Sequence, residues 1–310
     1  MNDREAEGIH NPPATPRSWN TGSALFRGMR LAGHLAYAML LAGCFPVLGR
    51  PRRRLFLQRW SLELLTILNV RLRVIGAPPG PHEKSMLLVA NHISWLDVFV
   101  MNAVRPAGFV AKSEVRSWPV IGTLCKAAQT IFIERNVRRD TMRVNRLIAH
   151  RLGQGECVAL FPEGTSTDGS HVDHFHSSLL QCAVDANVCV RPVAVRYHDG
   201  AGLRCGDASY FGEMSFIQSL LNILHSPSLH ATLVFLPELA SRGKNRRALA
   251  DDARAAICKA LHSLAPGVAT GRSPSGAKAQ FAPHYPEVSA PSVYSPLLHP
   301  LANSLKHPRP

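Results

Sequence analysis

From Arg71 onward, short apolar runs alternate with stretches of helical spacing, and this alternation predicts the fold class. The apolar runs predict strands at 72–76, 86–91, 108–112, 130–135, 157–164 and 188–197. Apolar positions three or four residues apart predict helices near 95–103, 119–128, 140–152 and 177–186. This alternation is typical of an α/β domain with a mostly parallel sheet flanked by helices. We expect that domain over residues 71–264.

The same pattern locates candidate chemistry at the ends of three predicted strands. Sites in sheets of this kind lie beyond the carboxyl ends of the strands. The residues at these positions are Asn91 and His92, Glu134 and Arg135, and Glu163 and Gly164. We therefore expect the functional side chains to gather at one edge of the sheet.

Two further apolar stretches precede this domain. Residues 31–49 are uncharged, and at about 1.5 Å per residue a helix of this length just crosses a hydrocarbon core of about 30 Å. The run contains His34 and Pro46 and has arginines on both flanks, so a re-entrant or interfacial helix is as well supported as a span. A signal peptide is disfavoured, because the run starts late and lacks a small-residue cleavage site. Residues 55–70 have helical spacing, which fits either a core helix or a membrane-apposed helix.

Charge favours a membrane-associated N-terminal segment. The chain has 35 Lys and Arg against 21 Asp and Glu, a net charge of +14, which indicates a polyanionic partner. No acidic residue lies between Gly8 and Leu62, where the arginines are Arg17, Arg27, Arg30, Arg50, Arg52, Arg53, Arg54 and Arg59. They bracket an apolar run rather than line a polar recognition helix, so we expect an anionic membrane surface and no nucleic acid.

Composition completes the predicted domain plan. Hydrophobic residues make up 46% of the 310 positions, which is enough for a core and excludes disorder throughout. We expect a flexible N-terminus over 1–25 and a basic membrane-associated helical segment over 26–70. The tail over 265–310 is rich in Pro and Ser, and we expect it to be disordered or loosely packed.

Several chemistries find no support in the sequence. The seven cysteines are odd in number and lack CxxC spacing, so neither a disulfide framework nor a zinc ribbon is expected. There is no GxSxG, Walker A or GxGxxG motif. The HVDHFH stretch over 171–176 suggests a metal cluster, but it lacks the HExxH pattern, and no metal is expected.

His92 and Asp97 form the candidate catalytic pair. An aspartate about one helical turn after a strand-end histidine can hold its ring in one tautomer, which leaves the other ring nitrogen as a general base. The spacing alone is weak evidence, because many such pairs arise by chance. Arg135 could equally be a solvated surface charge. Residues 161–166 could form a simple turn at Gly164, or a phosphate cradle helped by the Thr165 and Ser166 hydroxyls.

Four blocks in a fixed order are more specific than any single motif. They are NHISWLD over 91–97, IFIER over 131–135, FPEGT over 161–165 and VRPVAV over 190–195. This order resembles the glycerolipid acyltransferase family, specifically the bacterial 1-acylglycerol-3-phosphate acyltransferases. Residues 109–119 and 212–216 are similar as well, so the resemblance covers about residues 30–240. Gln129 replaces a usual glycine and Ser166 follows EGT where many members have arginine, which puts the acceptor preference in question.

The resemblance implies an activity. A fatty acyl group would pass from acyl-CoA or acyl carrier protein to the sn-2 hydroxyl of 1-acylglycerol-3-phosphate and form phosphatidic acid, without a cofactor. His92 would take the proton from that hydroxyl while Asp97 holds the imidazole, and no covalent enzyme intermediate is needed. The resemblance places the protein on the cytoplasmic side of the bacterial inner membrane.

The resemblance also implies substrate-binding residues. Arg135 would hold the acceptor phosphate, and the Gly164 and Thr165 amides would donate to it. Since a carboxylate repels a phosphate, Glu163 would instead orient Arg135 or a glycerol hydroxyl. Further members of the implied substrate site are Asn91 and Pro192.

Two alternatives stay open at this point. A lyso-ornithine-lipid O-acyltransferase, from a related family, would keep the chemistry and use an acceptor without a phosphate. A non-catalytic basic protein that binds membrane or nucleic acid would leave the His92–Asp97 pair without a role.

Overall fold

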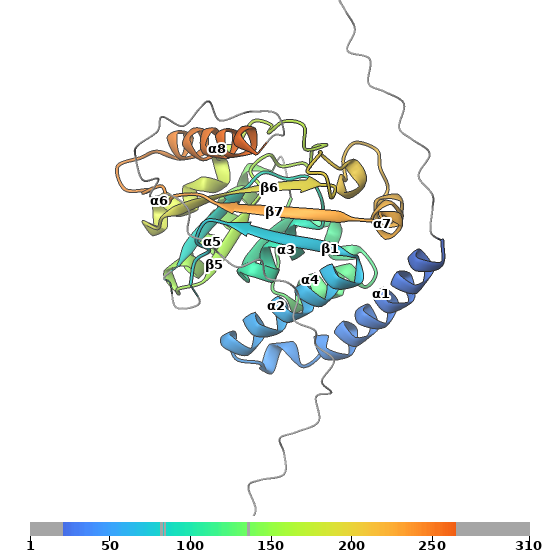
Figure 1. The fold of residues 1–310 in the computed structure, drawn as a ribbon. Helices are drawn as coiled ribbons and strands as arrows, with labels where there is room; N and C mark the ends of the chain where they lie inside the picture. The colour runs from blue at the N-terminus through green and yellow to red at the C-terminus, as the bar shows by residue number, and fades with distance from the viewer. Residues whose placement is uncertain (1–20, 81–82, 84, 135–136, 265–310) are drawn as a thin grey trace, which may run out of the picture.

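A seven-stranded sheet forms the centre of the computed structural model, which describes residues 21–80, 83, 85–134 and 137–264. The strand order across the sheet is β1-β7-β6-β2-β5-β3-β4 (Figure 1). The strands are β1 (Val70–Ile75), β2 (Met86–Ala90), β3 (Gly108–Lys112), β4 (Ile131–Ile133), β5 (Cys157–Leu160), β6 (Val190–His198) and β7 (Leu229–Phe235). All six predicted strands are present. The predicted strand 157–164 is shorter than expected, because the chain turns after Leu160.

The strand directions confirm a mostly parallel sheet. β2 pairs in parallel with β5 and β6, and β3 pairs in parallel with β4 and β5. β7 runs antiparallel to β6 and parallel to β1. The carboxyl ends of β2 to β6 therefore meet at one edge, where the candidate residues were expected.

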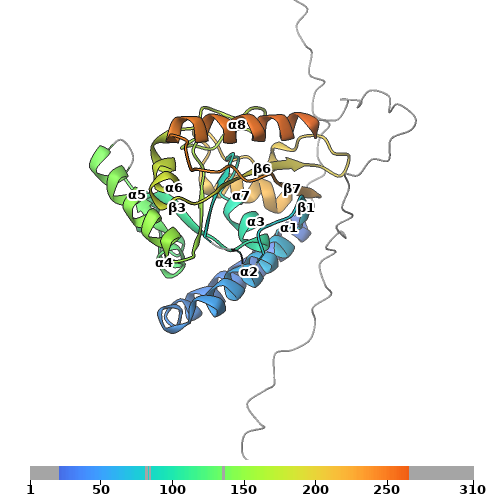
Figure 2. The same ribbon diagram turned by 90° about the vertical axis from the view of Figure 1, so that its left-hand side faces the viewer.

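Helices cover both faces of the sheet. The described helices are α1 (Thr21–Ala42), α2 (Arg50–Ile67), α3 (Asp97–Val104), α4 (Ile121–Ala127), α5 (Arg138–Gly153), α6 (Gln181–Ala186), α7 (Phe216–His225) and α8 (Arg246–Ser263). The described 3-10 helices are η1 (Phe45–Val47), η2 (Ser113–Ser117), η3 (Ser177–Leu180) and η4 (Gly206–Ala208). The helix predicted over 177–186 is divided between η3 and α6. In Figure 2, α8 lies on one side of the sheet and the pair α1 and α2 on the other.

Two apolar clusters hold these layers together. Alternate residues of β2 face opposite ways: Leu88 packs in a cluster with α1, α2, α3 and α7, while Leu87 packs with α5, α6 and α8. All five residues of β2 are buried, as expected for a central strand covered on both faces. The sheet is therefore a rigid support for the loops at its edge.

The N-terminal helices pack on the α/β domain. Leu31 and Ala38 of α1 belong to the core cluster, and the buried His34 ring stacks on Trp60 of α2 at 4.6 Å between centroids. Burial lowers the pKa of His34. The apolar stretch 31–49 is not one helix, because α1 ends at Ala42 and η1 follows. Among the described residues, none of the helices combines the length and hydrophobicity needed to cross a bilayer. The membrane association of this segment stays a prediction.

None of the seven cysteines, all of which lie in described segments, forms a disulfide. Burial raises the pKa of Cys182 to about 12, so its thiol acts as an apolar core group rather than a nucleophile.

Candidate active site

Asn91 fixes the point at which the chain leaves β2. Its side-chain Oδ1 accepts a hydrogen bond from the Val195 amide at 2.8 Å, and its Nδ2 donates to the Val195 carbonyl at 3.0 Å. The buried amide thus continues the pairing of β2 with β6 by one further step. Asn91 thereby sets the path of the loop that carries His92, and its predicted contact with substrate stays a prediction.

His92 and Asp97 meet as the sequence predicted. His92 Nδ1 lies 2.8 Å from Asp97 Oδ2, which also accepts the Ile93 amide at 2.8 Å and the Ser94 amide at 3.0 Å. A carboxylate only accepts, so Nδ1 carries the proton and Nε2 of the neutral ring has a lone pair. Asp97 is fully buried in the first turn of α3, where the helix dipole favours a negative charge.

Tyr197 completes the surroundings of Asp97. Its hydroxyl donates to Asp97 Oδ1 at 2.8 Å, and both side chains are buried. Burial, together with the neighbouring carboxylate, raises the pKa of Tyr197, so the hydroxyl stays protonated. Sequence reasoning missed this residue. The available signal was a single tyrosine on the strand face that also carries Val193 and Val195.

The His92 ring lies against an aromatic wall and keeps one side accessible. It stacks on Phe161 with 4.2 Å between ring centroids and an interplanar angle of 14°. Phe161 in turn stacks on Phe109 at 5.8 Å. The His92 side chain is 20% exposed, so a reactant can reach a ring whose plane is fixed by packing.

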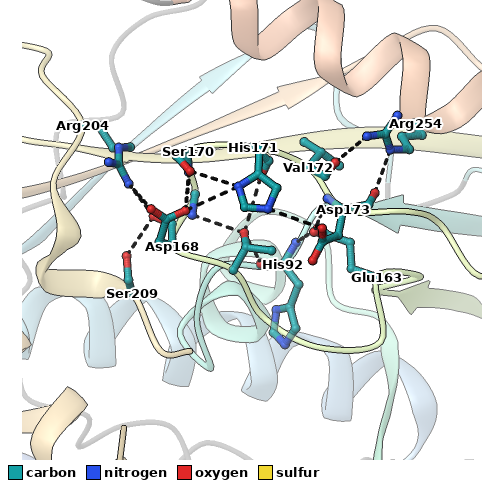
Figure 3. Close-up of polar contacts among 12 residues, drawn as sticks. His92, Glu163, Asp168, Ser170, His171, Val172, Asp173, Arg204, Ser209 and Arg254 are labelled. Carbon is teal, nitrogen blue, oxygen red and sulfur yellow. Dashed lines mark hydrogen bonds and ion pairs between the residues drawn. The ribbon is translucent and has the colours of Figure 1, made fainter. Parts of the chain in front are cut away.

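Glu163 connects the His92 loop to a second loop. Its Oε1 accepts the His92 main-chain amide at 2.6 Å, and its Oε2 accepts the Asp173 amide at 2.8 Å (Figure 3). Burial raises the pKa of Glu163, and the two backbone hydrogen bonds oppose that shift. The carboxylate therefore positions backbone on both sides of the site. Its predicted action on Arg135 lies outside the described residues.

In the turn after β5, one of the backbone amides that was predicted to bind phosphate forms a hydrogen bond within the turn. Gly164 has a φ of 75°, which favours glycine, and its amide donates to the Phe161 carbonyl at 3.1 Å. The Gly164 amide is thus engaged in the turn. Thr165 is exposed, and the Ser166 hydroxyl donates to the Tyr210 carbonyl. Phosphate binding at this turn stays a prediction.

Of the two remaining predicted residues, only Pro192 can be located in the structure. Arg135 lies outside the described residues. Pro192 is buried within the sheet, paired with Val89 of β2, and its carbonyl accepts the Leu236 amide at 3.0 Å where β7 has ended. The structure brings together Asn91, His92, Asp97, Glu163 and Gly164.

The histidine-rich stretch after this turn forms polar contacts. His171 Nδ1 lies 3.8 Å from Asp168, and His171 Nε2 lies 3.4 Å from Asp173. The described residues include no group of three or more His, Cys, Asp or Glu side chains arranged to hold a metal ion.

Comparison with known proteins identifies the family. The model of the acyltransferase family matches residues 71–196. The lyso-ornithine lipid O-acyltransferase of Pseudomonas aeruginosa is 33% identical over 256 residues, which cover 80% of this chain and 97% of that protein. The 1-acyl-sn-glycerol-3-phosphate acyltransferase of Neisseria meningitidis is 43% identical over 147 residues, which cover 47% of this chain and 57% of that protein.

A solved structure supports the same fold. The 1-acyl-sn-glycerophosphate (LPA) acyltransferase PlsC from Thermotoga maritima matches with a TM-score of 0.60 at 19% identity, covering 79% of this chain and 95% of that one. Because a relative more than 30% identical is matched over nearly its whole length, the chain belongs to the acyltransferase family.

Proposed function

We propose that the protein transfers a fatty acyl group from an acyl thioester to a hydroxyl of a lysolipid. The observation that carries the proposal is the His92–Asp97 pair, in which a buried, four-fold hydrogen-bonded carboxylate fixes the imidazole tautomer. The exposed part of the ring lies at the edge where the parallel strands end. Family membership supports the same class of reaction.

The proposed reaction needs one base and no covalent enzyme intermediate. His92 Nε2 takes the proton from the acceptor hydroxyl as its oxygen attacks the thioester carbonyl carbon. The C–S bond then breaks, and the leaving thiolate takes the proton from the imidazolium. Asp97 stabilises that imidazolium through Nδ1. No cofactor takes part, and the donor is acyl-CoA or acyl carrier protein.

The first candidate acceptor is 1-acylglycerol-3-phosphate, which would yield phosphatidic acid. The meningococcal relative named for this acceptor is 43% identical in the matched region. Arg135 and the exposed Thr165 would bind the phosphate through charge-assisted and neutral hydrogen bonds.

The second candidate acceptor is a lyso-ornithine lipid. The relative named for that acceptor matches 80% of this chain, against 47% for the meningococcal relative. Ser166 follows EGT where many members of the family have arginine, and its hydroxyl is already bonded to the Tyr210 carbonyl. An acceptor without a phosphate does not need that arginine.

A two-acceptor, two-donor assay separates these candidates. Purified protein receives 1-acylglycerol-3-phosphate or lyso-ornithine lipid, each with matched acyl-CoA and acyl carrier protein. Faster turnover of 1-acylglycerol-3-phosphate, reduced in Arg135→Lys because an ammonium lacks the guanidinium fork, supports the first candidate. Faster turnover of lyso-ornithine lipid, unchanged in Arg135→Lys, supports the second. Thioester consumption that needs no lysolipid contradicts both.

The proposed site of action is the cytoplasmic face of the bacterial inner membrane. α1 exposes large apolar side chains, including Phe26 at 57% and Leu40 at 79%, and α7 beside it exposes Ile217 at 62%. Figure 1 shows α1 and α7 together at one end of the molecule. Exposed apolar groups gathered in this way mark surfaces that bind lipid or protein. The arginines of the N-terminal segment would favour binding to anionic lipid over neutral lipid.

A further inference from the structure

We infer that Arg254 of α8 is a positioning residue for His92, acting through the Val172–Asp173 peptide and Glu163. This inference rests on the proposed function for its consequences in catalysis, and its geometry is independent of that function. Arg254 Nη2 donates to the Val172 carbonyl at 2.6 Å, and its Nε donates to the Asp173 carbonyl at 2.7 Å (Figure 3). Arg254 lies outside the matched family region and outside all four sequence blocks.

The contacts form one continuous chain because two of them share a peptide group. The carbonyl of Val172 and the amide of Asp173 belong to the same peptide bond. Arg254 binds that carbonyl, while the amide donates to Glu163 Oε2 at 2.8 Å. Glu163 Oε1 then accepts the main-chain amide of His92 at 2.6 Å. Arg254 is thus linked to the His92 backbone through one peptide and one carboxylate.

The charge of Arg254 acts on Glu163 through this series of hydrogen bonds. Among the described residues Glu163, which is 3% exposed, has no ion-pair partner within 4.0 Å. A guanidinium on the Val172 carbonyl polarises the peptide and strengthens its N–H as a donor, since hydrogen bonds in series reinforce one another. Arg254 thereby stabilises the buried Glu163 carboxylate without direct contact. The two guanidinium donors also bind the carbonyls of two successive peptides, which fixes the backbone orientation at Asp173.

Other contacts hold the same loop without Arg254. Asp168 accepts Arg204 Nη1 at 3.0 Å, and the Asp168 carbonyl accepts the Ser209 hydroxyl at 3.2 Å. Val172 and Phe175 are buried in the core. Removal of Arg254 is therefore expected to disturb the two successive peptides whose carbonyls it binds rather than to release the loop.

The experiment compares Arg254→Gln and Arg254→Lys with Arg247→Gln, an exposed arginine on the same helix. In Arg254→Gln we expect kcat to fall about tenfold to a hundredfold, since small misplacements of a reacting group have effects of this size. KM values for donor and acceptor and the thermal midpoint should stay close to wild type. Arg254→Lys, which can donate to one carbonyl but lacks the fork, should have an intermediate kcat. Arg247→Gln should resemble wild type.

A double-mutant cycle tests the route through Glu163. In the Glu163→Gln background, Arg254→Gln should lower kcat little further. The hydrogen bonds of Glu163, through which Arg254 is proposed to act, are already altered in that background. A loss as large as in the wild-type background would overturn the inference, as would wild-type kcat in Arg254→Gln. Equal losses in Arg247→Gln and Arg254→Gln would overturn it too.

Amide hydrogen exchange gives a readout that does not depend on activity. By NMR, the His92 and Asp173 amides should exchange faster in Arg254→Gln than in wild type, to a smaller extent in Arg254→Lys, and at the wild-type rate in Arg247→Gln. Unchanged exchange at both amides in Arg254→Gln and Arg254→Lys would contradict the inference. If wild type shows no acyl transfer, the proposed function fails, while the exchange result still decides the role of Arg254.

Discussion

Asp97 is the residue on which the candidate site depends. Its two carboxylate oxygens accept His92, two backbone amides and the Tyr197 hydroxyl, and the group is fully buried. A buried charge is tolerated only when it is satisfied in this way. Its four donors come from a short loop and one distant strand. The imidazole orientation is therefore set before any substrate binds.

The Tyr197 hydroxyl should contribute to both stability and activity. Tyr197→Phe leaves Asp97 Oδ1 buried without its described donor, which should lower the free energy of unfolding by about 1–3 kcal/mol. The acyl transfer rate should fall as well, because Asp97 is held less firmly. Urea unfolding and a rate assay measure the two effects. Tyr37→Phe, at an exposed position of α1, is the matched control and should change neither. Wild-type stability and rate in Tyr197→Phe would contradict this role.

At the residue scale, the sequence predicted contacts between residues that are close together along the chain. His92 and Asp97 are five residues apart on one strand–helix connection, so their meeting follows from local geometry. Tyr197 and Arg254 reach the site from β6 and α8, and no local pattern predicts such long-range contacts. Glu163 was expected to orient a side chain or a hydroxyl. In the described residues its oxygens accept two backbone amides, a role that the residue type alone does not indicate, and its action on Arg135 or a glycerol hydroxyl stays a prediction.

The element that shapes the site most directly is the turn that follows β5. This turn places Phe161 against the His92 ring and Glu163 against the His92 backbone. Its tight geometry requires the positive φ of Gly164, where an added Cβ would lie 3.3 Å from His176 Cδ2. A change at this glycine should therefore affect both the backbone and the site.

Gly164→Ala and Gly155→Ala test whether this turn matters for activity beyond stability. Both glycines have a positive φ, 75° and 79°, so alanine should cost about 1–2 kcal/mol at each. Only Gly164→Ala should also reduce acyl transfer, because Gly155 lies at the opposite end of β5 with open space around it. Urea unfolding and rate measurements report the two quantities. Equal rates in the two variants would show that the turn does not position the site.

Elements were predictable where their pattern is strong and local. β2 is a continuous apolar run, as a central parallel strand requires, and it was predicted within one residue of its observed end. β7 was not predicted. Its insertion between β1 and β6 is a long-range pairing, and its apolar run is interrupted by His230 and Thr232. The antiparallel direction of β7 relative to β6 likewise follows from the whole chain path and not from any local signal.

For the molecule as a whole, charge and exposed apolar surface both favour a lipid interface at α1. The helix packs one face on the core through Leu31 and Ala38 and exposes Phe26 and Leu40 on another. The next helix along the chain, α2, has two exposed arginines, Arg52 and Arg59. Binding through such a surface should have a salt-independent apolar part and a salt-dependent charged part.

Vesicle co-sedimentation at two salt concentrations separates these parts. The double variant Phe26→Ser, Leu40→Ser should bind neutral and anionic vesicles less, at either salt concentration. The double variant Arg52→Gln, Arg59→Gln should lose only its preference for anionic vesicles, at about 1 kcal/mol per arginine in low salt. Met142→Ser, an exposed apolar position on α5, is the control and should bind like wild type. Undiminished sedimentation of the Phe26, Leu40 variant in high salt would place the contact elsewhere.

The central claim is that His92 is the base of an acyl transfer to a lysolipid. The most direct measurement is the lysolipid-dependent release of thiol from an acyl thioester by wild type and by His92→Ala, each shown to be folded by circular dichroism. We expect steady release by wild type and a loss of about 10²–10⁴ in rate for His92→Ala, since the proton acceptor is gone. Near-normal release by a folded His92→Ala protein would contradict the account.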